Sequence, residues 1–154
     1  MRAVVQRVSR AEVRAGGETV ASIGRGLLVL LGITHGDTAE TARAFAQRIA
    51  GLRVFDDADG RMNLDLAAVG GAILCVSQFT LYGDVRRGRR PSFEAAAPGR
   101  AAQPVYRAFI EAVRGLGIPC GEGVFGAEMA VELVNDGPVT LVLDTDELAR
   151  PRRA

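Results

Sequence analysis

The five residues from Leu27 to Leu31 read Leu-Leu-Val-Leu-Leu, an uninterrupted aliphatic run that decides the fold. Gly24 and Gly26 mark a turn directly before it. A run of this length is short for a helix and is typical of a strand that is buried on both faces. We therefore predict a central strand here, with the other elements arranged around it.

Further strands are predicted on both sides of this run. Residues Arg2 to Arg14 alternate roughly between apolar and polar side chains, Gly16-Gly17 interrupts the pattern, and Glu18 to Ile23 resumes it, which is typical of a β-hairpin. Other predicted strands are Leu52–Phe55, Ala72–Val76, Met129–Val134 and Val139–Asp144. A hairpin turn is the simplest interpretation of Asn135-Asp136-Gly137-Pro138, which connects the last two.

Two helices are expected between these strands. Residues Thr38 to Ala50 carry apolar side chains at helical spacing, and Asp37 or Thr38 can cap the first turn. A second helix spans roughly Ala101 to Leu116 and stops at Gly117. We therefore expect an α+β fold, a single domain with a largely antiparallel, barrel-like β-sheet and two main helices.

The composition limits the classes of protein that fit. The chain has 154 residues, 48% of them apolar and 24% charged, which fits one globular domain and excludes wholesale disorder. We assign residues 1–148 to this domain and expect a flexible, Arg-rich tail at 149–154. A net charge of +1 excludes the positive field of a protein that coats nucleic acid, so any RNA contact must be local.

The expected environment is a reducing one. The two cysteines, Cys75 and Cys120, have no CxxC spacing, which argues against a zinc site. The acidic turn from Asp56 to Gly60 lacks the register of a calcium loop, so a solvated turn is the better interpretation. No signal peptide is expected, and no segment approaches the ~20 apolar residues that span a bilayer. We expect a soluble, cytoplasmic protein.

The segment Ser77-Gln78-Phe79-Thr80 follows a predicted buried strand and precedes a basic loop. Hydroxyl groups at a strand end are held by a rigid scaffold, so Ser77 or Thr80 could be a nucleophile. Such a nucleophile needs a base within hydrogen-bond reach, and the chain has one histidine, His35, in a loop. A catalytic triad is therefore a weak interpretation.

Two further segments have both a functional and a structural interpretation. The cluster Arg86, Arg87, Arg89 and Arg90 could bind phosphates or form a solvated loop. The segment from Phe125 to Met129 could offer an apolar shelf for a base or pack against the core. The sequence patterns leave both alternatives open.

Several segments together resemble the D-aminoacyl-tRNA deacylase family. They are the opening Met1–Val8, Ser77–Asp84 (SQFTLYGD), Arg90–Phe93 (RPSF), Phe125–Met129 (FGAEM) and Asn135–Thr140 (NDGPVT). The resemblance runs from residue 1 to about Asp144 and so covers nearly the whole chain.

The resemblance implies a substrate and an assembly. The substrate would be the ester that joins a D-amino acid, or glycine mischarged on the alanine tRNA, to the terminal adenosine of tRNA, and the role would be translation quality control. The protein would be a homodimer with active sites at the interface, without metal or cofactor. Gly137-Pro138 of one subunit, joined by a cis peptide bond and held by Arg7, would enter the site of the other subunit as a chiral gate that rejects L-aminoacyl-tRNA.

The resemblance also assigns roles within the site. Ser77, Gln78 and the main-chain N–H of Phe79 would stabilise the oxyanion and position the substrate, with Thr80 as a less favoured nucleophile. The ester is already activated, so water can attack it with help from the 2′-hydroxyl of the RNA. The adenosine pocket would be lined by Phe125, Gly126, Ala127 and Met129. The tRNA phosphates would contact Arg86, Arg87, Arg89 and Arg90.

Two other classes of protein fit the same residues. A non-catalytic RNA-binding module would use the basic loop and the apolar shelf but would leave charged tRNA intact. A threonine-nucleophile hydrolase of small esters would act without RNA and would form an acyl-enzyme on Thr80.

Overall fold

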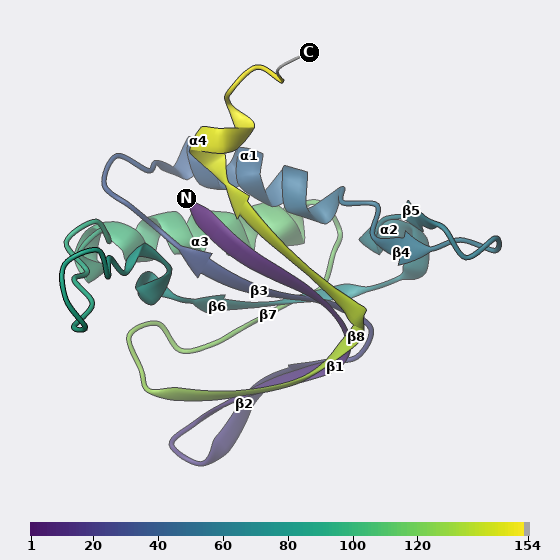
Figure 1. Ribbon diagram of the computed structural model, residues 1–154. Coiled ribbons are helices and arrows are strands. Elements are labelled where there is room, and N and C mark those ends of the chain that lie inside the picture. The colour runs from purple at the N-terminus through teal and green to yellow at the C-terminus, as the bar shows by residue number, and fades with distance from the viewer. Residues whose placement is uncertain (153–154) are drawn as a thin grey trace.

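The computed structural model describes residues 1–152, which fold around a six-stranded sheet (Figure 1). The strands of this sheet are β1 (Arg2–Ala15), β2 (Glu18–Ile23), β3 (Gly26–Gly32), β6 (Ala72–Ser77), β7 (Cys120–Glu122) and β8 (Met129–Asp144). The order is β2-β1-β3-β6-β7, and β8 also pairs with β1. The predicted central strand is confirmed, because β3 lies between β1 and β6.

The helices α1 (Ala39–Ala50) and α3 (Gly99–Gly115) cover one face of this sheet (Figure 1). The rings of Phe45 and Phe109, one from each helix, meet edge to face with 6.5 Å between their centroids. Odd-numbered residues of β3 point into the same core. Both predicted helices are therefore confirmed, with their apolar stripes packed on the sheet and on each other.

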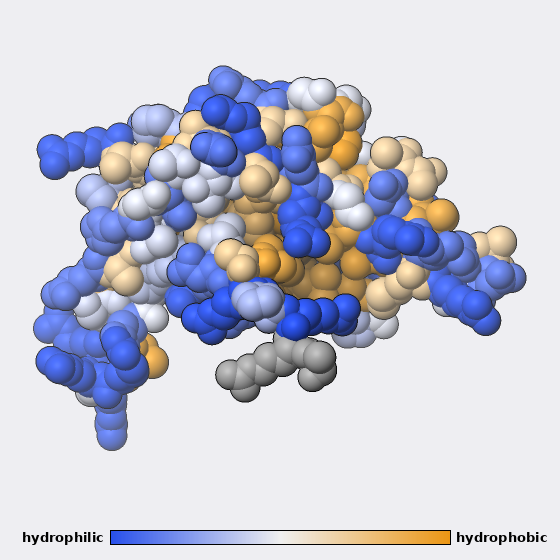
Figure 2. Space-filling model, turned by 90° about the horizontal axis from the view of Figure 1, so that it is seen from above, coloured by the Kyte–Doolittle hydropathy of each residue, from blue (hydrophilic) through white to orange (hydrophobic). Residues whose placement is uncertain are grey.

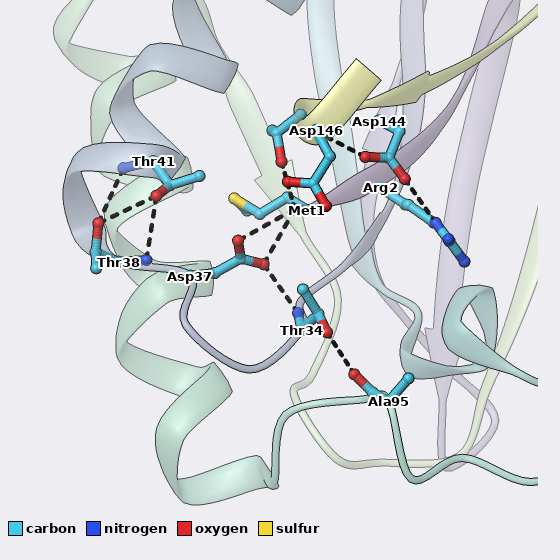
Figure 3. Close-up of polar contacts among 10 residues, drawn as sticks. Met1, Arg2, Thr34, Asp37, Thr38, Thr41, Ala95, Asp144 and Asp146 are labelled. Carbon is cyan, nitrogen blue, oxygen red and sulfur yellow. Dashed lines mark hydrogen bonds and ion pairs between the residues drawn. The ribbon is translucent and has the colours of Figure 1, made fainter. Parts of the chain in front are cut away.

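The N-terminus of α1 is fixed by local hydrogen bonds (Figure 3). The Thr38 hydroxyl accepts a hydrogen bond from the Thr41 N–H at 3.2 Å, and the Thr41 hydroxyl accepts one from the Thr38 N–H. The Asp37 carboxylate accepts a hydrogen bond from the Thr34 N–H at 2.9 Å. Thr38 is therefore the cap, and Asp37 ties the preceding loop to the end of β3.

The sheet curls so that its second face is covered by strands rather than by helices. Even-numbered residues of β3 and β6 pack there against Val8, Ala11 and Val13 of β1 and against side chains from β2 and the first half of β8. In Figure 1 these segments lie below β6 and β7. The predicted barrel-like α+β fold is confirmed, with β1 antiparallel to its three neighbours and the pairs β3–β6 and β6–β7 parallel.

The strand β8 differs from the prediction. It runs unbroken from Met129 to Asp144 and pairs with β1 along both halves, so the predicted hairpin turn between two strands is wrong. Asn135 lies opposite Val8, and Thr140 lies opposite Gln6. The turn-forming residues read locally as a hairpin, but the long partner strand β1 continues on both sides of them.

Short elements complete the chain. They are β4 (Phe55–Asp56), β5 (Met62–Leu64), α2 (Leu66–Val69), the 3-10 helix η1 (Phe79–Tyr82) and α4 (Thr145–Leu148). The strand predicted at Leu52–Phe55 begins only at Phe55, and the predicted turn after Asp56 joins β4 to β5. Of the predicted tail, Arg153 and Ala154 lie outside the described residues. None of the helices in residues 1–152 has the length and hydropathy needed to cross a membrane.

Candidate active site at the end of β6

A cavity of about 540 Å³ opens at the end of β6. It lies between η1, the start of α3 and the segment that leads into β8. The predicted residues that line it are Ser77, Gln78, Phe79, Phe125, Gly126, Ala127 and Met129. The structure therefore brings the proposed ester-binding segment and the proposed adenosine shelf to one place, although about 50 residues separate them in the sequence.

Other residues of the cavity were missed by sequence reasoning. They are Ile33, Val76, Phe93, Ala96, Ala97, Pro98, Gly99, Ala102 and Val131. Most are small and apolar, so nothing distinguishes them from core residues in the sequence. Phe93 could have been identified, because it belongs to the RPSF segment of the family resemblance. Its ring meets that of Phe79 edge to face, with 5.1 Å between the ring centroids.

At the mouth of the cavity the backbone changes from the extended strand β6 to the 3-10 helix η1. β6 ends at Ser77, and the chain turns into η1 at Phe79, so the expected strand end at Ser77 to Thr80 extends only to Ser77. Within residues 1–152 the main-chain N–H groups of Phe79 and Thr80 donate no hydrogen bond, and the Ser77 hydroxyl makes none. Ser77 and Phe79 line the cavity, so the Ser77 hydroxyl and the Phe79 N–H can bind an oxygen atom of a ligand there.

Gln78 and Thr80 interact with each other. The Gln78 Nε2 donates a hydrogen bond to the Thr80 Oγ1, and Thr80 is not among the residues that line the cavity. The sole histidine, His35, has its Nε2 2.8 Å from the main-chain oxygen of Glu94. Among the described residues, no base makes a hydrogen bond with Ser77 or Thr80, so nothing activates either hydroxyl as a nucleophile.

The wall of the cavity that carries Ala96 and Ala97 is fixed to the end of β3. The Thr34 hydroxyl donates to the main-chain oxygen of Ala95 (Figure 3), and the Ala97 N–H donates to the main-chain oxygen of Ile33 at 3.0 Å. His35 adds the contact with Glu94 described above. These bonds give the cavity a rigid wall next to Phe93.

Phe125 has a structural role as well as a place in the cavity. Its half-buried ring packs against that of Tyr106 with 5.6 Å between centroids, and the buried Tyr106 hydroxyl donates to the main-chain oxygen of Cys75 at 3.0 Å. Burial raises the pKa of Tyr106, which keeps this donor protonated. Phe125 therefore lines the cavity and also packs against the core, and its use as a shelf for a base stays a prediction.

The basic loop between Asp84 and Ser92 is closed by mutual main-chain hydrogen bonds of these two residues. Hydrophilic side chains project from this end of the molecule in Figure 2. The Arg86 guanidinium hydrogen-bonds the Asp84 carboxylate and lowers the pKa of Asp84 to about 2. Arg87, Arg89 and Arg90 are exposed, with no ion pair among the described residues. Arg86 therefore has less free charge to offer a phosphate than the other three.

Arg7, Gly137 and Pro138 lie apart from the cavity of their own chain. The predicted cis peptide bond between Gly137 and Pro138 is present, and both residues are exposed. Arg7 is 7% exposed; its Nη1 donates to the main-chain oxygen of Val54 at 2.7 Å, and its Nε donates to that of Asp136 at 3.2 Å. The predicted contact between Arg7 and this segment is therefore observed within one chain.

Comparison with known proteins finds relatives along nearly the whole chain. The family model for D-Tyr-tRNA(Tyr) deacylase matches residues 4–144. The D-aminoacyl-tRNA deacylase of Chloroflexus aurantiacus is 58% identical over 154 residues, which are 100% of this chain and 96% of that protein. The corresponding protein of Thermus aquaticus is 58% identical over 147 residues, 96% of this chain and 97% of its own length.

Two solved structures have the same fold. The c-Myc DNA unwinding element binding protein is 44% identical, with a TM-score of 0.88 over 94% of this chain and 98% of its own. A probable eukaryotic D-amino acid tRNA deacylase, 18% identical, has a TM-score of 0.79 over 92% of this chain and 97% of its own, which shows the shared fold. With the family model and the relatives above, the chain belongs to the D-aminoacyl-tRNA deacylases, hydrolases of the aminoacyl-tRNA ester.

Proposed function

We propose that the cavity at the end of β6 holds the terminal adenosine and its D-aminoacyl ester, and that the free main-chain N–H of Phe79 stabilises the charge that develops on the ester. As a nucleophile adds to the ester carbonyl, negative charge develops on its oxygen. Preorganised N–H donors stabilise that charge without reorganisation. The Ser77 hydroxyl and the Gln78 amide lie beside the Phe79 N–H and orient the ester.

The attacking oxygen comes from water in this mechanism. No base of the protein stands beside Ser77 or Thr80 within residues 1–152, so a covalent acyl-enzyme is disfavoured. The 2′-hydroxyl of the terminal ribose lies next to the ester and assists the attack. The tRNA leaves as the alcohol and the amino acid as the carboxylic acid. Charged tRNA as the substrate places the reaction in the cytoplasm.

The adenosine would lie on the shelf from Phe125 to Met129. This wall combines the aromatic ring of Phe125 with Gly126, which has no side chain, and Ala127, which has only a methyl group, so a flat base has room. The exposed Arg87, Arg89 and Arg90 stand on a loop that ends near Phe93, so they would meet the backbone of the acceptor stem.

Stereochemical selection would come from a second copy of the chain. Gly137 and Pro138 are exposed, are held by the buried Arg7, and do not line the cavity of their own chain. In a homodimer, Gly137-Pro138 of one subunit would enter the cavity of the other and collide with an L-side chain. A glycyl ester has no side chain that could collide with this segment, so it would be accepted like a D-aminoacyl ester.

The first experiment compares the release of amino acid from three substrates: D-Tyr-tRNA, L-Tyr-tRNA and the alanine tRNA mischarged with glycine. We expect hydrolysis of the D-aminoacyl and glycyl esters and no hydrolysis of the L-ester. An RNA-binding module would leave all three intact. A threonine-nucleophile hydrolase would cleave small esters without RNA and would leave an acyl group on Thr80.

Hybrid dimers test the origin of the gate. A chain with Gln78→Ala is mixed with a chain with Gly137→Ala under conditions that exchange subunits. If the gate acts across the interface, one site of each hybrid carries both changes and the other carries neither, so the hybrid has one site that is active and selective. If the gate acts within one chain, every site is defective. Sedimentation analysis first establishes that the protein is a dimer.

A further inference from the structure

The pairing of β8 with β1 is irregular at two places, between Gln6 and Val8 and between Val8 and Arg10, and the extra residues of β8 lie at the first of them. Thr140 lies opposite Gln6 and Asn135 lies opposite Val8, so residues 136–139 of β8 stand against Arg7 alone. A bulge of this kind leaves main-chain groups without their ladder partners. Buried or half-buried carbonyl groups need another donor.

The side chain of Asn135 supplies the missing donors. Its Nδ2 donates to the main-chain oxygen of Arg7 and to that of Val139, both at 3.0 Å. Its Oδ1 accepts from the Thr140 Oγ1 at 3.2 Å, and the Thr140 Oγ1 accepts from the Gln6 Nε2 at 3.3 Å. One amide therefore closes the two ends of the bulge against each other and against β1.

We propose that Asn135 is a positioning residue that sets how far Gly137-Pro138 projects from the strand and thereby sets the chiral selectivity. The inference rests on the proposed function, in which this segment enters the cavity of a partner. Arg7 holds the segment through Asp136, with its Nε 3.2 Å from the Asp136 main-chain oxygen. Asn135 holds the ends of the bulge, which Arg7 does not contact by its side chain, so the two residues act at different points.

The proposed role of Asn135 depends on its N–H donors and not on the shape of its side chain. An aspartate has nearly the shape of an asparagine, but as a carboxylate it only accepts hydrogen bonds. At position 135 it would face the two carbonyl oxygens that Nδ2 now binds, and they would repel it. The ends of the bulge would move apart. Asn135 does not line the cavity, so the groups that bind the ester would keep their places.

The test measures kcat and KM on D-Tyr-tRNA and L-Tyr-tRNA for Asn135→Asp. The matched control is Asn63→Asp, the same change at the other asparagine of the chain, which is exposed on β5. We expect the ratio of kcat/KM for the D-substrate to that for the L-substrate to fall about tenfold or more in Asn135→Asp. A displacement of ~1 Å at a site can change a reaction rate by a large factor. The fall comes from faster hydrolysis of the L-ester. Asn63→Asp keeps the wild-type ratio.

The wild type is measured first, so that two failures can be told apart. A wild type that hydrolyses both esters equally rejects the proposed gate itself. A selective wild type with an equally selective Asn135→Asp overturns the role of Asn135. Loss of activity on D-Tyr-tRNA without any gain on L-Tyr-tRNA also overturns it, since that is the mark of a residue needed only for folding.

A second pair of variants decides the matter if Asn135→Asp does not fold. Thr140→Val removes the hydroxyl that orients the Asn135 amide, and Thr140→Ser keeps it. We expect Thr140→Val to raise hydrolysis of the L-ester about threefold, the scale of one exposed hydrogen bond, and Thr140→Ser to leave it unchanged. Equal selectivity in the two Thr140 variants overturns the inference.

Discussion

The end of β6 and the bulge of β8 use hydrogen bonds in opposite ways. At the end of β6, the N–H groups of Phe79 and Thr80 and the Ser77 hydroxyl have no partner in the described part of the chain. In the bulge, Asn135 and Arg7 satisfy the main-chain oxygens that the ladder leaves open. Free donors can bind a charge that develops during a reaction, whereas satisfied groups give a surface of fixed shape. In the proposed function, hydrolysis and stereochemical selection therefore separate under mutation.

Gly137→Ala is expected to have the largest effect. Gly137 has a φ of +119°, and a Cβ there would lie 2.8 Å from the Arg7 Nη2 and 3.0 Å from the Val139 Cγ2. We expect a loss of about 1–3 kcal/mol in the free energy of unfolding and an increase of roughly 100-fold in hydrolysis of L-aminoacyl-tRNA as the segment moves. Urea denaturation and deacylation assays measure the two effects.

A control separates backbone strain from the clash at Gly137. Gly60→Ala places a Cβ at a φ of +75° with nothing within 4 Å, so it should lower stability and leave selectivity unchanged. Unchanged hydrolysis of the L-ester in Gly137→Ala would contradict a role of this segment in selection.

Gln78→Ala should impair hydrolysis at the end of β6 and leave stereochemical selection by the bulge intact. It removes an amide that orients the ester, and we expect kcat/KM on D-Tyr-tRNA to fall by about 100-fold, the scale of a substrate misplaced by ~1 Å. The ratio of D- to L-ester hydrolysis should stay the same, since the bulge is untouched. Gln47→Ala on the exposed face of α1 is the control. A loss no larger than that of Thr80→Ala would reject the role given to Gln78.

Replacing Arg86, Arg87, Arg89 and Arg90 together by alanine should weaken tRNA binding by on the order of tenfold and flatten its dependence on salt, by about one unit of slope for each phosphate that the protein no longer binds. Arg86→Ala alone should contribute least, because the Asp84 carboxylate already neutralises Arg86. Binding isotherms at several salt concentrations measure the slope. The same slope in wild type and quadruple variant would mean that the loop is only a solvated surface.

Thr80→Ala should have the smallest effect, within about threefold of wild-type activity, because no base activates the hydroxyl. The change removes the acceptor of the Gln78 Nε2, and the freed amide can still donate into the cavity. Single-turnover assays on D-Tyr-tRNA give the rate. Mass spectrometry of the wild type during turnover provides the opposing result: an aminoacyl group on Thr80 would overturn the mechanism.

Elements that bury a regular face were predictable from the sequence. The two long helices carry an apolar periodicity because each packs one face on the same core, and the unbroken apolar run from Leu27 to Leu31 reflects a strand that is buried on both faces. The continuity of β8 and the bounds of β4 were not predictable in this way. They depend on pairing with other strands, of β8 with β1 and of β4 with β5. The turn-forming residues within or beside these strands predict a break in the strand when the sequence is considered locally.

The site divides along the same line. Ser77, Gln78, Phe79 and the shelf from Phe125 were placed together by the family resemblance and lie in one cavity. The opposite wall came from small residues such as Ala96 and Ala97, whose place depends on contacts of Thr34 and Ile33 with a distant loop. The role of Asn135 could not be predicted either, because its significance arises only from the register between β8 and β1.

The bulge also determines which of the two hydrophobic cores each half of β8 packs against. Four residues, 136–139, stand against one, Arg7, and this surplus of three is odd. Odd-numbered side chains before it, from Met129 to Leu133, therefore contact the core below the sheet, and those after it, from Val139 to Leu143, contact the core beneath the helices. Because strand side chains alternate with period two, deleting or inserting one residue there would exchange inside for outside along a whole half-strand, whereas changes of two preserve the alternation. The length of the segment can therefore vary only in even steps.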